Sequence, residues 1–188
     1  MVPTLFLFPT EAEAAGLRRR RADAAYAVVG VGMAEAAAGT VRALSEARPR
    51  RAVLCGIAGV CGDGLHAGDV VEVVEDSVGA LPAVYRRIYV SPRRTALAAA
   101  RAVTVNAVGE AVPPLQEGAA CGTDAAQPPS LPVVEQMEGA AVAAVCAAMG
   151  VEYLHIRAVS NRVGDARCAW RVEDAVEALG AAAAELCE

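Results

Sequence analysis

The sequence predicts an α/β fold: a three-layer α/β/α sandwich with a central, mostly parallel sheet. The main observation is that short runs rich in β-branched residues alternate with alanine-rich stretches of helical composition. This alternation is typical of parallel strands joined by right-handed crossover helices. The second observation is the length of 188 residues, which corresponds to about one domain. We find no repeat or dividing linker, so residues 1–188 are expected to form a single domain.

The expected elements follow one another at short intervals. The strands are predicted at Thr4–Phe8, Ala25–Val31, Arg51–Ile57, Asp69–Val74, Ala102–Val108 and Tyr153–Val159. The helices are predicted at Met33–Ala47, Arg93–Ala100, Glu138–Met149 and Val172–Leu186. Gly150 is expected to end the third of these helices. Gly109–Pro132 contains five of the ten prolines and is expected to be irregular.

The composition excludes several classes of protein. Hydrophobic residues make up 55% and charged residues 21%, which excludes a disordered chain. The chain has no lysine, so all 17 basic residues are arginine. Enzymes that need a Schiff-base lysine or a P-loop lysine are therefore excluded. The net charge of −5 argues against a nucleic-acid partner.

The cysteines and the apolar segments add further limits. Six cysteines occur without a C-x-x-C pair, and there are only two histidines, so a zinc site is not expected. The apolar runs are interrupted before they reach the length of a membrane span, and the N-terminal segment lacks the basic start of a signal peptide. We expect a cytoplasmic protein with reduced thiols.

Three local motifs have more than one interpretation. Gly30-Val31-Gly32 follows a predicted strand, but Glu35 stands where a dinucleotide-binding motif needs its third glycine, so a nicotinamide enzyme is not expected. The glycines between Gly56 and Gly64 form either a tight turn or a backbone that approaches a flat ligand. Arg18–Arg21 is either a solvated turn or a clamp for phosphate or carboxylate.

Polar side chains follow the ends of several predicted strands. Glu13 follows the first strand, Glu138 follows Val133-Val134, and Asn161 follows Tyr153–Val159. Each acid alone could be a residue that favours a helix N-terminus. Because ligands bind outside the carboxyl ends of strands in open α/β sheets, the three together indicate a site.

These residues lie in segments that resemble the nucleoside phosphorylase and nucleosidase superfamily. The resemblance is most specific in Glu135-Gln136-Met137-Glu138-Gly139-Ala140-Ala141, followed by Ile156-Arg157-Ala158-Val159-Ser160-Asn161. Weaker matches are Thr10-Glu11-Ala12-Glu13, Gly30-Val31-Gly32, and Gly56-Ile57-Ala58-Gly59 with Gly68-Asp69-Val70-Val71. The matches follow the order of the family and cover nearly the whole chain. The resemblance implies hydrolysis of a purine N-ribosidic bond without a metal or cofactor.

The resemblance also implies roles for single residues. Glu13 would orient or deprotonate the attacking water, Glu138 would bind the ribose hydroxyls, and Met137 would pack beneath the sugar. Asn161 would stabilise the departing base, and Arg157 would hold Glu13 in place. Further residues would line the substrate pocket: Ser160, Ile57, Ala58 and Val108.

The identity of residue 161 narrows the expected substrate. Adenine-cleaving relatives have aspartate where this chain has Asn161. An amide oxygen can accept from N7–H of a 6-oxopurine while the amide NH₂ donates to O6. Together with Thr104-Val105-Asn106-Ala107-Val108 and Trp170, this looks most like the futalosine hydrolases, which release hypoxanthine from futalosine in menaquinone biosynthesis. The resemblance implies a homodimer whose partner can complete the pocket.

Other functions remain open at this point. A 6-oxopurine nucleoside phosphorylase would need an arginine cluster for phosphate, which Arg18–Arg21 could supply. A methylthioadenosine/S-adenosylhomocysteine nucleosidase is a second alternative. A nucleoside-binding protein without catalytic activity is a third, against which the joint presence of Glu13, Glu138 and Asn161 speaks.

Overall fold

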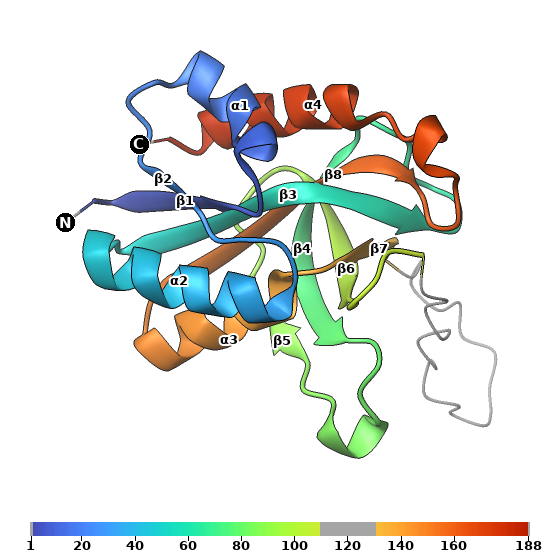
Figure 1. Ribbon diagram of the computed structural model, residues 1–188, viewed down its shortest axis with the longest axis horizontal. Coiled ribbons are helices and arrows are strands. Elements are labelled where there is room, and N and C mark those ends of the chain that lie inside the picture. Colours follow the sequence, from blue (N-terminus) through green and yellow to red (C-terminus); the bar gives the residue numbers. More distant parts are fainter. Residues whose placement is uncertain (1, 110–130, 188) are drawn as a thin grey trace.

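The computed structural model describes residues 2–109 and 131–187 (Figure 1). Its strands are β1 (Thr4–Phe8), β2 (Tyr26–Val28), β3 (Arg51–Cys61), β4 (Val70–Val78), β5 (Tyr89–Val90), β6 (Ala98–Thr104), β7 (Val133–Gln136) and β8 (Glu152–Arg162). Its helices are α1 (Glu11–Arg20), α2 (Met33–Ala47), α3 (Gly139–Met149) and α4 (Val172–Glu185), with 3₁₀ turns at Ala83–Tyr85 and Arg167–Ala169. None of the described helices is long and apolar enough to cross a membrane.

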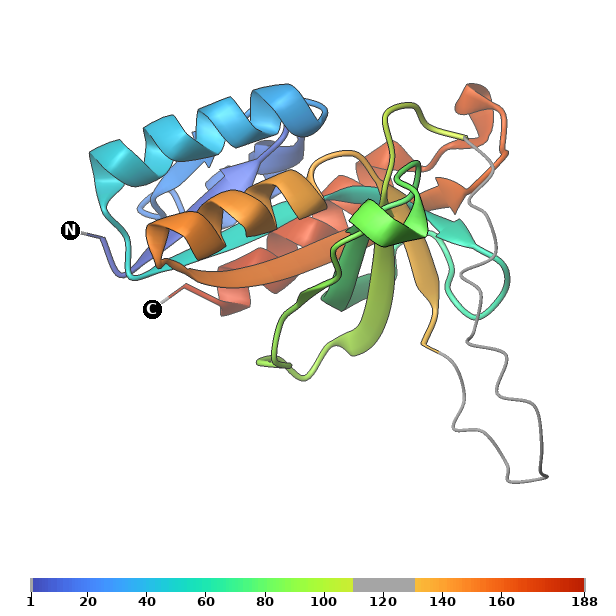
Figure 2. The same cartoon turned by 90° about the horizontal axis from the view of Figure 1, so that it is seen from below.

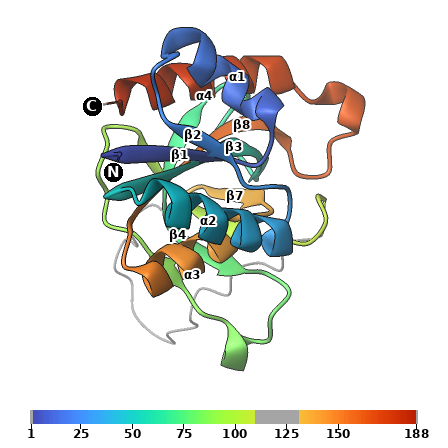
Figure 3. The same ribbon diagram turned by 60° about the vertical axis from the view of Figure 1, so that its left-hand side comes forward.

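The sheet has helices on both of its faces. Helices α1 and α4 pack together on one face, and α2 and α3 lie side by side on the other (Figures 2 and 3). Period-two alternation in β1 explains the two cores, because Phe6 and Phe8 point into the cluster under α1 and α4, whereas Leu5 and Leu7 point into the cluster under α2 and α3. The predicted three-layer α/β/α fold is confirmed.

The sheet is mixed, as expected. Within the described residues, five of the eight strand pairings are parallel and three are antiparallel. The strand order is β2-β1-β3-β7-β6-β4-β5, and β8 pairs with both β3 and β4. Strands β3, β8, β4, β6 and β7 therefore close into a ring, because β7 returns to pair with β3. This closure brings β7 and the end of β8 next to the last residues of β3, from Gly59 to Cys61.

One predicted helix is wrong. Arg93–Ala100 is not helical, and its last residues begin strand β6. The carboxylate of Glu72 accepts hydrogen bonds from the backbone N–H groups of Arg94 and Thr95 at 2.7 and 2.8 Å, and β6 pairs in parallel with β4. Pairing within the sheet thus overrides the helix propensity of alanine. Strand β6 also starts earlier than predicted and ends at Thr104, short of Val108.

Three other strands are longer than predicted, one of which is β4, which ends at Val78 instead of Val74. Strand β3 continues through Gly56 and Gly59 to Cys61, so the predicted turn does not begin at Gly56. A side chain at Gly56 would overlap the guanidinium of Arg157. The interpretation of Gly56 as part of a tight turn is therefore wrong: it lies within β3 and leaves room for a neighbouring side chain. Strand β8 extends to Arg162 and carries Asn161 within it.

Helix α1 was not predicted, and it explains the arginine run. Arg18–Arg20 form its last turn. Arg18 pairs with Glu11, Arg19 and Arg20 pair with Glu177 of α4, and Arg21 pairs with Asp23. All four arginines thus bind carboxylates of this chain, and none lines the cavity described below. The arginines are therefore solvated, as the first interpretation predicted, but they lie at the end of a helix and not in a turn. The predicted irregular segment falls mostly on residues 110–130, outside the described residues.

Candidate functional site

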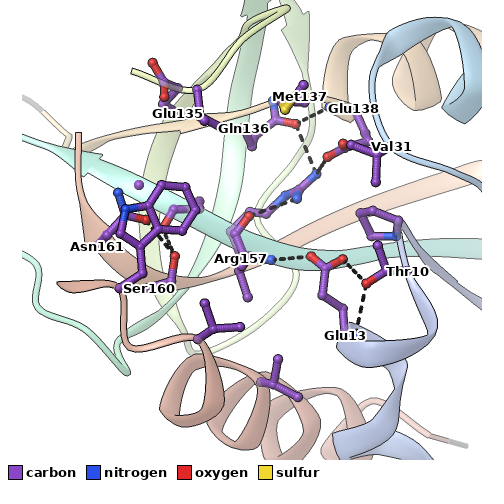
Figure 4. A pocket seen from close by; sticks show the side chains of 18 of the residues that line it. Thr10, Glu13, Val31, Glu135, Gln136, Met137, Glu138, Arg157, Ser160 and Asn161 are labelled. Carbon is purple, nitrogen blue, oxygen red and sulfur yellow. Dashed lines mark hydrogen bonds and ion pairs between the residues drawn. The ribbon is translucent and has the colours of Figure 1, made fainter. Parts of the chain in front are cut away.

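A cavity of about 360 Å³ lies where β3, β7, β8 and the start of α1 meet (Figure 4). All nine residues that the sequence analysis assigned to the site line it: Glu13, Ile57, Ala58, Val108, Met137, Glu138, Arg157, Ser160 and Asn161. They come from five separate parts of the chain. The sheet closure described above is what gathers them into one place.

Glu13 lies in the first turn of α1 with a fixed orientation. Its Oε1 accepts from the backbone N–H of Ile57 at 3.0 Å, and its Oε2 accepts from the hydroxyl of Thr10 at 2.7 Å. Thr10 is the N-cap of α1 and also accepts from the N–H of Glu13. Burial raises the pKa of Glu13, although hydrogen bonds from Ile57 and Thr10 and the charge of Arg157 partly oppose the shift. The carboxylate is thus held in one orientation, and each oxygen keeps a lone pair for a further donor.

Glu138 occupies the N-cap position of α3 and is only 3% exposed. Its Oε1 accepts from the backbone N–H of Gly32 at 3.0 Å, and its Oε2 accepts from Nη2 of Arg157 at 3.2 Å. Gly32 has a φ of 83°, a conformation that favours glycine. The Gly30-Val31-Gly32 motif therefore presents a backbone donor to Glu138.

Arg157 differs from its expected role. The sequence analysis paired it with Glu13, but within the described residues its ion pair is with Glu138. Its Nη1 donates to the backbone oxygen of Ile57 at 3.1 Å, and the N–H of the same residue donates to Glu13. Arg157 lies between the two carboxylates in Figure 4. It therefore contacts Glu138 directly and reaches Glu13 only through the backbone of Ile57 and through its charge.

Asn161 and Ser160 lie at a β-bulge. The pairing of β3 with β8 shifts between Ala58 and Gly59, so that Ser160 is the extra residue on β8. The hydroxyl of Ser160 donates to Oδ1 of Asn161 at 2.7 Å, and Nδ2 of Asn161 donates to the backbone oxygen of Arg162 at 2.7 Å. One lone pair on Oδ1 and one hydrogen on Nδ2 remain for a ligand.

Several lining residues were not assigned to the site from the sequence. Thr10 could have been recognised as the helix N-cap that precedes Glu13, and Gln136 belongs to the motif that also holds Met137 and Glu138. Arg167 and Trp170 could not have been placed, because their segment has no regular pattern. Val31, Val172 and Val176 add apolar surface, and the remaining lining residues are Pro9, Ala12, Gly59 and Glu135. The described residues include no group of three histidine, cysteine, aspartate or glutamate side chains that could hold a metal ion.

Comparison of the sequence with known protein families identifies the family of this chain. The sequence model of the family described as the phosphorylase superfamily matches residues 20–188. The chain belongs to the phosphorylase superfamily. Most of the site lies within the matched residues, and Glu13 lies just before them. No curated protein sequence matches the chain.

Solved structures in this superfamily share the fold at low sequence identity. The methylthioadenosine/S-adenosylhomocysteine nucleosidase of Neisseria meningitidis, in complex with methylthio-immucillin-A, has a TM-score of 0.78 and 17% identity, over 99% of this chain and 98% of that chain. A futalosine hydrolase mutant of Helicobacter pylori has a TM-score of 0.79 and 11% identity, over 96% of both chains. The methylthioadenosine/S-adenosylhomocysteine nucleosidase of the same organism has a TM-score of 0.75 and 11% identity, over 96% and 95%.

Proposed function

We propose that the protein hydrolyses the N-ribosidic bond of a 6-oxopurine nucleoside, and that the nucleoside is futalosine. The products would be hypoxanthine and dehypoxanthine futalosine. The observation that supports this proposal is the presence of Asn161, with one donor and one acceptor available, in the same cavity as Glu13 and Glu138. Two of the similar structures are methylthioadenosine/S-adenosylhomocysteine nucleosidases, and one is a futalosine hydrolase.

In the proposed reaction the bond between C1′ and N9 breaks and the sugar becomes cationic. Water adds to C1′, and Glu13 accepts a proton from it. The raised pKa of Glu13 brings its basicity closer to neutral pH, where a general base works best. The electron pair of the broken bond stays on the purine, which gains a proton and leaves as hypoxanthine.

The sugar is bound by Glu138 and Met137. The carboxylate of Glu138 already accepts from Gly32 and Arg157, and its remaining lone pairs can accept from the two ribose hydroxyls. Its negative charge attracts the sugar more strongly in the cationic transition state than in the ground state, which is the requirement for catalysis. Met137 is half-buried and supplies an apolar surface in the cavity.

The base is bound by Asn161. Its Oδ1 can accept from N7–H of the departing hypoxanthine, and its Nδ2 can donate to O6. The hydroxyl of Ser160 donates to Oδ1, so this oxygen is kept as the acceptor and the amide is fixed in the orientation that a 6-oxopurine needs. An adenine leaving group offers an acceptor at N7 and a donor at its amino group, which this orientation does not match.

Arg167 and Trp170 favour futalosine over methylthioadenosine. The guanidinium of Arg167 lies 4.2 Å from the centre of the Trp170 ring, and within the described residues it forms no ion pair. Both side chains line the cavity. An aromatic ring with a neighbouring free cation suits the benzoate of futalosine, whereas methylthioadenosine carries no anion.

We also infer that the protein acts as a homodimer. The segment from Leu81 to Val90 exposes five large apolar side chains: Leu81, Val84, Tyr85, Ile88 and Val90, of which Val84 is 82% exposed. A cluster of this kind marks an interaction surface, and a second copy of the chain is the occupant that the family resemblance implies.

Sedimentation analysis should give a dimer, and Val84→Glu should shift it to a monomer. A wild-type monomer at micromolar concentration would contradict the inference.

The function is tested by product analysis. The purified protein is incubated with futalosine, inosine and methylthioadenosine, with and without phosphate, and the bases are separated by chromatography. We expect hypoxanthine from futalosine at a rate that does not depend on phosphate. Dependence on phosphate would identify a phosphorylase. Faster release of adenine from methylthioadenosine would identify the other nucleosidase, and binding without cleavage would identify a non-catalytic member.

A further inference from the structure

Behind the Glu138–Arg157 pair lies a buried amide that contacts both partners. Gln136 ends strand β7 and is 3% exposed. Its Oε1 accepts from the backbone N–H groups of Glu138 and Gly139 at 2.8 and 2.6 Å, and from Nη2 of Arg157 at 3.0 Å. The same oxygen thus satisfies the first N–H groups of α3, which have no partner inside the helix, and holds the guanidinium that pairs with Glu138.

The nitrogen of the same amide is fixed by two acceptors. Nε2 of Gln136 donates to Oδ2 of Asp76 at 3.0 Å and to Oγ1 of Thr104 at 2.7 Å. The hydroxyl of Thr104 donates to Oδ1 of Asp76 at 2.9 Å and accepts from the N–H of Ala140 at 2.9 Å. Because the hydroxyl hydrogen is already used, Thr104 can only accept from Gln136. The amide therefore cannot rotate by 180° without losing these contacts.

A histidine supports Arg157 from its other side. Nε of Arg157 donates to Nε2 of His155 at 2.7 Å. Burial and the charge of Arg157 hold the pKa of His155 well below its ordinary value, so the ring stays neutral and Nε2 remains an acceptor. Nδ1 of the same ring lies 3.8 Å from Oδ2 of Asp76. Asp76 thus lies next to both Gln136 and His155, the two neutral side chains that accept hydrogen bonds from the guanidinium.

The space around this cluster is filled. A side chain at Gly139 would overlap Oδ2 of Asp76, and its Cβ would lie 2.6 Å from Cε1 of His155 and 2.8 Å from Nε2 of Gln136. Such separations are below contact distance. The cluster is therefore packed as a rigid unit, and a movement of Gln136 would move Arg157 and the start of α3 with it.

We propose that Gln136 is the positioning residue of the Glu138–Arg157 pair. Its amide oxygen sets the place of the Glu138 backbone and of the Arg157 guanidinium at the same time, and Asp76 and Thr104 set the direction of the amide. Asp76, Thr104 and His155 act through Gln136 and Arg157 and do not touch the substrate. The proposal rests on the proposed role of Glu138 in binding the ribose.

A double-mutant cycle tests the proposal. Gln136→Met keeps the volume and removes every hydrogen bond. We expect kcat/KM to fall about 10- to 100-fold, as for a misplaced catalytic group. Glu138→Gln alone should lower it about 10²- to 10³-fold. If Gln136 acts through Glu138, adding Gln136→Met to Glu138→Gln should cost less than about threefold more. Losses that simply multiply would overturn the proposal.

Ligand binding provides a readout that does not depend on turnover. Calorimetry is done with hypoxanthine and with 9-deazainosine, a nucleoside whose carbon–carbon bond resists hydrolysis. Gln136→Met should weaken 9-deazainosine binding several-fold and leave hypoxanthine binding unchanged, since only the nucleoside reaches Glu138. Equal weakening of both ligands would indicate a general structural role. Failure of the wild-type protein to bind 9-deazainosine would instead count against the proposed function.

A rescue variant tests the proposal independently, in case Gln136→Met does not fold. Combining Gln136→Glu with Asp76→Asn reverses the polarity of two contacts: the new amide donates to the new carboxylate, and the hydroxyl of Thr104 turns from residue 76 to donate to the same carboxylate oxygen. The other carboxylate oxygen still accepts from Glu138, Gly139 and Arg157. This double variant should recover activity to within about tenfold of the wild type. A folded but inactive double variant would contradict the proposal. Thr40→Val serves as the control, because it removes a buried hydroxyl outside the cavity lining and should leave kcat/KM unchanged.

Discussion

Glu13 shows how burial and local donors act in opposite directions on one carboxyl group. Burial raises its pKa, and the donors from Ile57 and Thr10 limit the rise. The proposed base must be ionised to accept a proton from water. The acidic limb of the pH profile of kcat/KM should therefore lie above 4.5, the ordinary pKa of glutamate, with activity falling as the pH drops through the raised pKa.

Glu13→Gln should remove this acidic limb together with most of the activity. General-base catalysis is worth roughly 10²- to 10⁴-fold, so we expect a loss of that size in kcat. Hypoxanthine binding, measured by calorimetry, should change little because the base is bound at Asn161. A collapse of hypoxanthine binding along with the rate would mean that Glu13 has a structural role at the start of α1.

Asn161→Asp should shift the preference of the enzyme towards 6-aminopurine nucleosides. An ionised aspartate repels O6 of hypoxanthine and cannot donate to it. The loss of one hydrogen bond to a buried polar group costs about 1–3 kcal/mol, which corresponds to roughly 5- to 150-fold slower hypoxanthine release. The measurement is the ratio of kcat/KM for futalosine to that for its 6-amino analogue. An unchanged ratio would show that Asn161 does not distinguish the two bases.

At the scale of elements, a close helix crossing holds Glu13 in place. Helices α1 and α4 touch at Gly16 and Gly180, where a side chain on either residue would overlap the backbone of the other helix. Gly180→Ala should push α1 outward, because overpacking of this kind costs about 1–3 kcal/mol. We expect a lower midpoint in urea denaturation and, in the folded protein, a reduced kcat with unchanged hypoxanthine binding. Unchanged stability would show that the two helices separate freely.

At the scale of the whole molecule, Asp76 links stability to pH. Burial raises the pKa of Asp76 to about 7 from an ordinary value of 3.8. Between these values the folded protein holds a proton that the unfolded chain has lost, so the free energy of unfolding decreases as the pH rises through this window. Above pH 7 both states are ionised and the decrease ends.

Asp76→Asn should remove this dependence. Urea denaturation at pH 5 and pH 7.5 gives the difference in the free energy of unfolding for each protein, and this difference should be smaller in the variant than in the wild type. The absolute stability of the variant should also fall, because the new amide places a donor against Gln136. Asp63→Asn, at an aspartate whose side chain is 94% exposed, serves as the control. An equal difference in wild type and Asp76→Asn would contradict the prediction.

The sequence alone determined much of this protein. The fold class and helix α2 follow from local composition, and all nine assigned site residues line one cavity. The reason is that strand ends converge at one edge of a sheet, so Glu13, shortly after β1, and Asn161, near the end of β8, can be grouped from the sequence. The family resemblance, which is most specific in the motif around Glu138, supplied the other site residues.

Only the tertiary structure decided which side chains touch. Arg157 pairs with Glu138 instead of Glu13, Gly56 makes room for the guanidinium, and β6 forms where alanine content predicted a helix. The contacts of Gln136 with Asp76 join residues 60 positions apart. Each of these features depends on how β3, β8, β4, β6 and β7 close into a ring. Such pairing between distant segments is not encoded in local composition or spacing.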